Sequence, residues 1–443
     1  MPRRYGPEVS TRRKVLVAVL CVAGAVVLAG VGLALWLRSS IDDSRTAMYD
    51  GRLVDADLWE ADPRILSAGF GFDGIISAPA DDQGTTVAAG GAWDSLLACG
   101  KDGGPTDGDR SSLALATVVD LSVLKEDGAE IQYTDGTPVV FSWPVRTDTV
   151  RPSQFRFTLN TGDVVDVGVA TMMPNFELNE RNTVVMFADL GNRGLPGEAD
   201  ARYPVRLDIV PASDGTELML AGPNGDVTAT GLSWETTNTS YASGPTLVGA
   251  KLNRIGDPPQ GEGPVGSFGN GSMPNDERST FGEAGDFRLR MLTSGGFSPD
   301  GVRGVLPTDF GTFFRIHATG NDGQDVVIDT VGEPVAVKGG TLTVVGISDL
   351  GLAASAADGI AYDDCYLEDR DNYLDIVLSG DDAAARSITD LEIPGLDGGY
   401  RPLFNPGGPG QTPTPGVRYT APGPSHMQPV TIALDDPMRV SRD

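Results

Sequence analysis

The chain has 443 residues, with 33 Lys and Arg against 61 Asp and Glu, which gives a formal net charge of −28. A surface this acidic repels nucleic acid phosphates and anionic lipid headgroups, so we expect no nucleic-acid partner and no adsorption to lipid by charge alone. Gly (58) and Pro (31) are abundant, as in β-proteins with many turns, and a chain of this length is expected to form more than one domain.

The N-terminal region carries the strongest signal. Val15 to Leu37 contains no charged residue, and a helix over it would be about 35 Å long, enough to cross a hydrocarbon core of about 30 Å. Basic residues dominate the preceding segment, 1–14, which favours its cytoplasmic placement. The sequence predicts a cytoplasmic stub (1–14), a single transmembrane helix (15–37) that anchors the chain in the cell membrane, and an ectodomain outside.

Two alternatives remain for this region. A secretory signal peptide would be removed, and the protein would then be secreted with a mature N-terminus near Leu35, although signal peptides usually have a shorter apolar region. Arg12 and Arg13, followed by Val15 and Leu16, also resemble the twin-arginine export signal. Either route still places the body of the protein outside the cytoplasm.

Composition divides the rest of the chain into segments. After the apolar run we predict a linker and mixed segment, in which we expect a short helix at Ala92–Cys99 and a loop at Lys101–Ser112. A Gly-, Pro- and Asn-rich stretch then separates two β-rich regions, and a proline-rich arm with a terminal strand ends the chain. The boundaries are 38–112 for the mixed segment, 113–255 for the first lobe, 256–279 for the linker, 280–400 for the second lobe and 401–443 for the arm.

Short runs of Val, Ile, Thr and Phe alternate with Asp-Gly pairs, which supply the positive φ angles of tight hairpin turns. Their spacing favours antiparallel sandwiches over βαβ units, so the predicted fold class is all-β, with two β-sandwich-like lobes after the transmembrane helix. The expected strands are 113–119, 139–143, 155–159, 183–187, 205–210, 217–220, 287–292, 312–317, 325–330, 341–347, 373–378 and 430–434.

One part of the first lobe resembles a known family. Val139-Val140-Phe141-Ser142-Trp143-Pro144-Val145 is followed by Phe155-Arg156-Phe157-Thr158-Leu159, and Tyr203 to Val210 is similar to a penultimate strand. Over residues 137–210 the chain thus resembles the bacterial Ig-like domains of S-layer proteins. That resemblance implies a spacer or binding module at a cell surface, and it implies no chemistry.

The cysteines allow one disulfide outside the apolar run, which itself contains Cys21. Cys99 and Cys365 are the remaining two. In an oxidising compartment two such residues suggest a bond between them, and two separate buried thiols are the alternative.

A cluster of acidic residues surrounds Cys365. Asp369, Asp371 and Asp375 place carboxylates of the kind that Ca²⁺ prefers within a short segment, and we expect no other cofactor. The alternatives are a solvated acidic loop and a pair of carboxylates that hydrolyses a glycan.

Catalytic motifs are scarce. The chain has two histidines, His317 and His426, and it contains neither a Gly-x-Ser-x-Gly elbow nor a His-Glu-x-x-His motif. We expect His317 to be an ordinary strand residue. The leading hypothesis is therefore a membrane-anchored extracytoplasmic β-protein with a binding or structural role at the cell envelope, and a protein or glycan ligand as its partner. A carboxylate-dependent extracytoplasmic hydrolase that acts on a glycan is the alternative.

Overall fold

The computed structural model describes part of the chain. The described residues are 51–68, 134–172, 175, 177–191, 197–235, 246–255, 281, 283–295, 305, 307–348, 372–395 and 425–443, and the strand backbones of 93–99, 105–111, 402–404 and 418–420. Over these residues the structure consists mainly of β-strands, with only short helices, which confirms the all-β prediction. None of the helices found there is long and apolar enough to cross a membrane, and the predicted span 15–37 lies outside this part.

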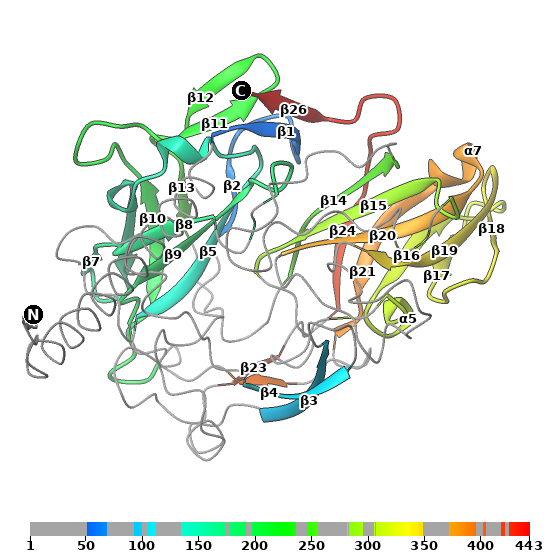
Figure 1. The fold of residues 1–443 in the computed structure, drawn as a ribbon, viewed down its shortest axis with the longest axis horizontal. Coiled ribbons are helices and arrows are strands. Elements are labelled where there is room, and N and C mark those ends of the chain that lie inside the picture. Colours follow the sequence, from blue (N-terminus) through cyan, green and yellow to red (C-terminus); the bar gives the residue numbers. More distant parts are fainter. Residues whose placement is uncertain are drawn as a thin grey trace, which may run out of the picture.

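Two groups of sheets each enclose a hydrophobic core, and Figure 1 shows them on opposite sides of the molecule. The first group contains two four-stranded sheets, β2-β5-β9-β8 and β13-β10-β6-β7, together with the hairpin β11-β12 and the ribbon β1-β26. The bounds of its strands are β1 Leu53–Asp57, β2 Ile65–Ala68, β5 Asp135–Phe141, β6 Phe155–Leu159, β7 Val164–Val165, β8 Val169–Thr171, β9 Thr183–Ala188, β10 Pro204–Ile209, β11 Met219–Gly222, β12 Gly225–Thr228, β13 Ser233–Glu235 and β26 Arg439–Arg442.

The second group contains a six-stranded sheet, β18-β19-β20-β15-β14-β25, and a four-stranded sheet, β17-β16-β21-β24. Both sheets contribute to one core, as Leu289 and Ile376 of the first and Ile316 and Leu391 of the second show. The bounds are β14 Leu247–Arg254, β15 Phe287–Thr293, β16 Arg315–Thr319, β17 Asp325–Ile328, β18 Val335–Val337, β19 Gly340–Ser348, β20 Tyr373–Gly380, β21 Ile388–Ile393, β24 His426–Pro429 and β25 Thr431–Ile432.

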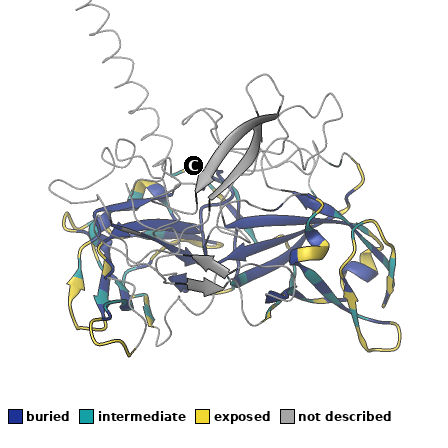
Figure 2. Cartoon of the chain, turned by 90° about the horizontal axis from the view of Figure 1, so that it is seen from below, coloured by how far each residue is buried: buried dark blue, intermediate teal, exposed yellow. Residues whose placement is uncertain are grey.

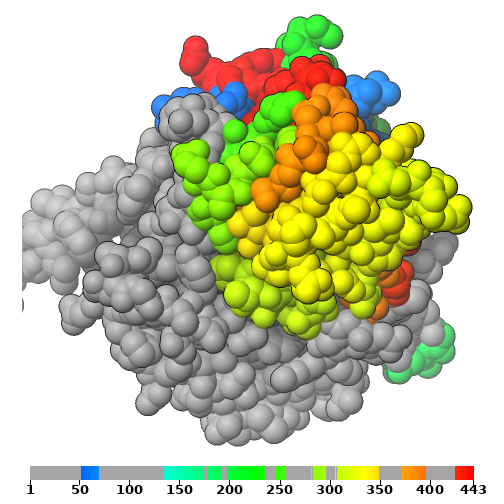
Figure 3. Space-filling view, turned by 90° about the vertical axis from the view of Figure 1, so that its right-hand side faces the viewer, coloured from blue at the N-terminus to red at the C-terminus, as the bar shows by residue number. Residues whose placement is uncertain are grey.

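The two groups do not follow the chain in simple succession. β14, which the sequence analysis placed at the end of the first lobe (113–255), pairs with β15 in the six-stranded sheet of the second group. β25 pairs in parallel with β14 in the second group, whereas β26, a few residues later, pairs with β1 in the first group. In Figure 3 the red C-terminal residues accordingly lie beside the blue residues of β1.

Some local predictions were wrong. The expected helix Ala92–Cys99 is the strand β3 (Trp93–Cys99), and part of the expected loop Lys101–Ser112 is its antiparallel partner β4 (Pro105–Ser111). Pairing along a ladder outweighs weak local preferences in such short segments. The strand pair β22 (Pro402–Phe404) and β23 (Arg418–Thr420) lies in the segment predicted as a proline-rich arm.

The expected strand 312–317 also begins differently. A single helical turn, α5 (Phe310–Phe313), precedes β16, and Phe310 and Phe314 stack with their ring centroids 6.5 Å apart. Residues four positions apart meet on one face of a helical turn, so this turn brings together two aromatic rings that an extended strand would hold apart along its axis. The other short helices are η1 (Thr147–Thr149), η2 (Pro152–Gln154) and α7 (Asp382–Ala385).

Burial is continuous along the central strands of the second group. All residues of β15 are buried, and so are the first six of β20. Figure 2 shows the strands in dark blue in the middle of the molecule, with exposed residues in the peripheral turns and loops. A strand buried on both faces needs a second layer beyond the core, and here the first group supplies it.

Candidate functional site

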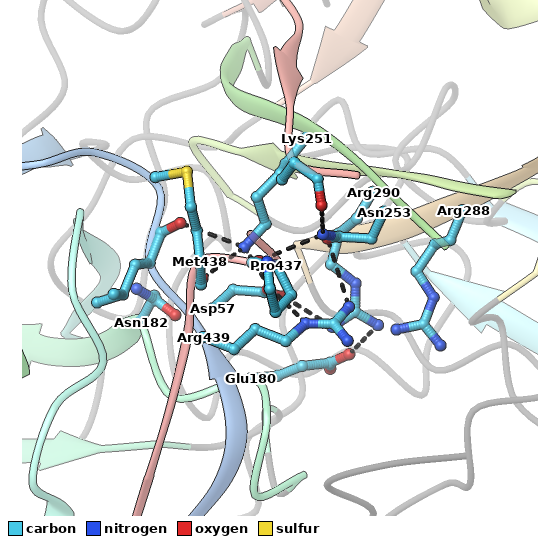
Figure 4. A network of polar contacts seen from close by, with 12 residues as sticks. Asp57, Glu180, Asn182, Lys251, Asn253, Arg288, Arg290, Pro437, Met438 and Arg439 are labelled. Atoms are coloured by element: carbon cyan, nitrogen blue, oxygen red, sulfur yellow. Dashed lines mark hydrogen bonds and ion pairs between the residues drawn. The ribbon is translucent and has the colours of Figure 1, made fainter. Parts of the chain in front are cut away.

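Ionisable side chains gather where the first group covers the six-stranded sheet. We call this cluster the ion network; its members are Asp57, Glu180, Lys251, Arg288, Arg290, Asp375 and Arg439, and Figure 4 labels all of them except Asp375. Asp57, Glu180 and Arg439 come from the first group, and the other four come from β14, β15 and β20. The network therefore joins segments that lie far apart in the sequence.

Strand register places three of these charges in one row. Lys251 pairs with Arg290 across β14 and β15, and Arg290 pairs with Asp375 across β15 and β20. Directly paired residues point to the same face of a sheet, so the three side chains share the face turned away from the second core. Their neighbours along the strands, such as Leu289 and Ile376, point into that core.

Asp57 receives cations from three strands. Its carboxylate is bound by the Lys251 ammonium, by Arg290 (Nη1–Oδ2 3.2 Å) and by Arg439 (Nε–Oδ1 3.3 Å), and its side chain is 1% exposed. Burial disfavours the carboxylate, but Lys251, Arg439 and Arg290 outweigh burial and hold the pKa of Asp57 well below its usual range. Asp57 is thus a permanent anion at neutral pH.

Lys251 has an acceptor for each of its three protons. Besides Asp57, its Nζ atom donates to the carbonyl oxygens of Leu58 at 3.2 Å and Met438 at 3.0 Å. The ammonium also lies 5.4 Å from the centroid of the Trp59 ring. Burial lowers the pKa of Lys251 to about 8, with Asp57 acting in the opposite direction. The Lys251 side chain is 0% exposed, so a substrate cannot reach its ammonium group.

Arg290 contacts carboxylates from three segments. It binds Asp375 through two hydrogen bonds (Nε–Oδ1 2.8 Å and Nη2–Oδ2 2.9 Å), Glu180 at 2.9 Å and Asp57 at 3.2 Å. A second guanidinium, that of Arg288, approaches Asp375 at 3.0 Å. The planar fork of arginine suits such multiple contacts, and buried charges are tolerated only when they are paired and hydrogen-bonded in this way.

A neutral set of contacts extends the same interface. The Tyr373 hydroxyl donates to Asn182 Oδ1 at 3.1 Å, and the amide of Asn372 donates to Thr183 Oγ1 at 3.0 Å. Trp59 of the first group packs with Tyr373, with ring centroids 6.1 Å apart, in a small hydrophobic cluster that also contains Leu292. Apolar contact and hydrogen bonds therefore surround the charges.

The C-terminal segment, Ala433–Asp443, closes the network. Asn253 of β14 donates to the carbonyl oxygens of Ala433 and Pro437 at 3.0 and 3.2 Å. Met438 has a positive φ of 51°, which is unusual for a residue with a side chain, and its carbonyl accepts from Lys251. The strained residue thus aims a backbone oxygen at the buried ammonium.

Of the predicted calcium ligands, the structure describes Asp375 alone. Its carboxylate faces Arg288 and Arg290, and Asp369 and Asp371 lie outside the described residues. Among the residues that are described, no three His, Cys, Asp or Glu side chains are grouped to hold a metal ion. For the predicted disulfide, the structure gives the backbone of Cys99, and Cys365 lies outside the described part.

Sequence reasoning missed the ion network, although a signal was present. Lys251, Arg290 and Asp375 each stand within a run of apolar residues that forms a strand. A charge in such a run indicates either a solvent-facing position or a buried partner of opposite sign, and only the pairing of the strands decides between them.

The chain was compared with protein-family models, with curated proteins and with solved structures, and none of them matches it.

Proposed function

We propose that the protein is a non-enzymatic, membrane-anchored component of the cell envelope, whose two sheet groups are β-sandwich lobes that act as one rigid binding or structural body. Anchoring rests on the uncharged run Val15 to Leu37, after a basic N-terminus. The resemblance of residues 137–210 to Ig-like domains of S-layer proteins supports a surface role.

The buried charges between the two groups are the main support for one rigid body. Asp57, Lys251, Arg290 and Asp375 are at most 1% exposed, and Asp57 of the first group is paired with Lys251 and Arg290 of the second. Hydrolysis of a glycan needs two carboxylates that face a substrate, one of them able to donate a proton. The low pKa of Asp57 and its lack of exposure favour a structural role for the carboxylate.

The surroundings of His317 also favour a non-enzymatic role. His317 contacts Asp325 and Glu392, and the hydroxyl of Ser425 is bound to Glu392. A serine nucleophile must be bonded to the histidine that takes its proton, and here a carboxylate lies between the two. This arrangement does not activate Ser425.

Two further expectations belong to the same proposal. We propose that Cys99 and Cys365 form a disulfide, which the oxidising side of a membrane would permit. Peptide mapping of the non-reduced chain should find the cross-linked pair, and two free thiols would contradict it. Calcium binding by the segment with Asp369 and Asp371 predicts a rise in melting temperature on addition of Ca²⁺ that a magnesium salt does not give.

Localisation tests the proposal directly. The full chain with a C-terminal epitope should sediment with membranes, and protease added to intact cells or spheroplasts should digest its body. A chain that lacks residues 1–37 is the control, and it should remain in the soluble cytoplasmic fraction. Recovery of the full chain in that fraction would overturn the anchoring.

Activity and binding are tested separately. The full chain should release no product from purified envelope glycans, whereas affinity purification after cross-linking in cells should recover a defined envelope component. A control with the same anchor and an unrelated body removes partners of the membrane helix. Glycan hydrolysis that is lost in an Asp369→Asn or Asp371→Asn variant of unchanged melting temperature would favour the hydrolase.

A further inference from the structure

His317 on β16 is held between two carboxylates from the neighbouring strands. Its Nδ1 lies 2.9 Å from Asp325 Oδ2 on β17, and its Nε2 lies 3.0 Å from Glu392 Oε2 on β21. Glu392 also accepts a hydrogen bond from Ser425, the residue before β24. The three carboxylate contacts thus follow the strand order β17-β16-β21-β24 across the whole four-stranded sheet.

Both contacts are favourable only for one protonation state. A neutral imidazole has one N–H donor and one nitrogen lone pair, so one of its two nitrogens would point a lone pair at an ionised carboxylate. The imidazolium cation donates from both nitrogens and neutralises part of the charge around it. The geometry therefore selects the doubly protonated ring.

The other charged groups near the ring are mostly acidic. Asp390 on β21 pairs directly with His317 in register and so points to the same face, and Arg315 on β16 lies 3.9 Å from Glu392. His317 and Glu392 are partly shielded, with side chains 12% and 14% exposed, while Asp325 is 57% exposed. Shielding strengthens the contact with Glu392, whereas solvent screens the one with Asp325.

We propose that His317 is a pH-responsive pin, which in its doubly protonated form ties the strands β17, β16 and β21 together and on deprotonation loosens the pairing of β16 with these two neighbours. Burial disfavours the cation, but the hydrogen bonds and charges of Asp325 and Glu392 raise the pKa of His317 above its usual value. The protein would thereby be more stable in a mildly acidic medium outside the cell than in an alkaline one, as far as this sheet is concerned.

The sign follows from linkage. A histidine whose pKa is higher in the folded state stabilises the fold fully below its unfolded pKa of about 6.5, and this contribution disappears as the pH rises through the folded value. Deprotonation of His317 removes one of its two N–H donors. It also removes the positive charge that offsets the repulsion among the carboxylates of Asp325, Asp390 and Glu392. The exchange of amide protons in β17 and β21 should then increase beyond the intrinsic effect of pH.

Selective labelling of the imidazole carbons tests the proposal in the full chain. The chain has only two histidines, so two signals are expected, and His426→Gln assigns them. The His317 signal should titrate above about pH 6.5, and the His426 signal below it, because burial lowers the pKa of His426. A His317 signal that titrates at or below that value would overturn the proposal.

Two variants separate a pH-responsive pin from an ordinary polar contact. Asp325→Asn should shift the midpoint of the His317 titration to lower pH. Asp329→Asn, the same change at the residue that follows β17, should leave the midpoint unchanged. The difference in melting temperature between the wild-type chain and His317→Gln should be positive at pH 5.5 and vanish at pH 9. A difference of the same size at both pH values would contradict the pin.

Discussion

At the scale of single residues, Asp57 decides whether the buried cations are tolerated. It is the carboxylate shared by Lys251, Arg290 and Arg439, and the interface contains these charges at almost no exposure. Removal of one partner from a buried ion pair leaves the other charge uncompensated, which costs more than the pair contributes. The effect of a substitution here should therefore be large and should depend on its partners.

We expect Asp57→Asn to destabilise the fold by about 3 to 5 kcal/mol, as measured by chemical denaturation. Asp62→Asn, at an exposed position five residues later, is the matched control and should change the stability by less than about 0.5 kcal/mol. In a Lys251→Met background the cost of Asp57→Asn should be smaller, because one of the unpaired cations is gone. Equal costs in both backgrounds would contradict the coupling.

The same variant has a pH signature. Because the pKa of Asp57 is lower in the folded than in the unfolded state, its contribution is complete above the unfolded pKa of about 3.9 and is lost as the pH falls towards the folded value. The stability difference between wild type and Asp57→Asn should thus be constant from pH 5 to 7 and shrink below about pH 4. A difference that grows on acidification would be incompatible with an ionised Asp57.

Gly249 permits the close packing of Trp59 against the six-stranded sheet. A Cβ atom at this position would lie 2.5 Å from Cε3 of Trp59. Gly249→Ala should therefore cost about 1 to 3 kcal/mol by overpacking. The cost should fall in a Trp59→Leu background, in which the smaller side chain can move aside, and denaturation of the four chains gives the comparison.

At the scale of elements, the C-terminal segment connects the two groups. Asp435 binds Arg386 of the second group with Oδ1–Nη2 at 2.7 Å, and Arg442 binds Asp226 of the first group at 3.1 Å. Between these two contacts the segment supplies the Met438 carbonyl and Arg439 to the ion network. β26 also pairs with β1, and Val440 of β26 lies with Leu53 and Ala56 of β1 in the first core.

We expect removal of residues 438–443 to destabilise the chain at least as much as Asp57→Asn. The deletion takes away an acceptor of Lys251, one cation of Asp57 and the whole partner strand of β1. Removal of Asp443 alone, whose backbone oxygen accepts from Arg146, is the control and should have little effect. Denaturation midpoints report the change, and equal stability of the two truncated chains would show that the segment does not close the interface.

At the scale of the whole molecule, the interface makes the two cores interdependent. Each core is formed by its own sheets, yet the outer face of the six-stranded sheet is buried by the first group and carries charges that only that group neutralises. Separation of the groups would expose Leu292 and Tyr373 and leave Arg290 without Asp57 and Glu180. The chain should therefore unfold in one cooperative transition.

Arg290→Met should split that transition. The variant leaves Asp57, Glu180 and Asp375 with fewer cations, so hydrogen exchange followed by mass spectrometry should show the strands of one core opening before those of the other. Arg206→Met is the matched control, because its ion pairs are partly solvent-exposed and lie within the first group, so they contribute little, and this variant should retain a single transition. Coincident opening of both cores in Arg290→Met would contradict the role of the network.

The amino-acid sequence by itself determined those strands whose own residue pattern is typical of a β-strand. Phe155–Leu159 and Tyr373–Leu378 were recognised as strands because apolar or β-branched residues alternate or accumulate between turn residues, and β6 and the start of β20 lie there. Strands with little pattern of their own were not found: β26 (Arg439–Arg442) exists because β1 supplies its hydrogen bonds. Segment 15–37 and the acidic residues Asp369 and Asp371 remain predictions.

Only the tertiary structure decided where the charges within the strands go. Lys251, Arg290 and Asp375 have the spacing of solvent-facing positions, and the sequence carries no information about which strand will lie beside them. The register of β14, β15 and β20 places them in one row, and the ribbon of β1 and β26 covers that row with Asp57 and Arg439. Such pairing is a long-range choice, because it depends on contacts between residues separated by nearly the whole length of the chain.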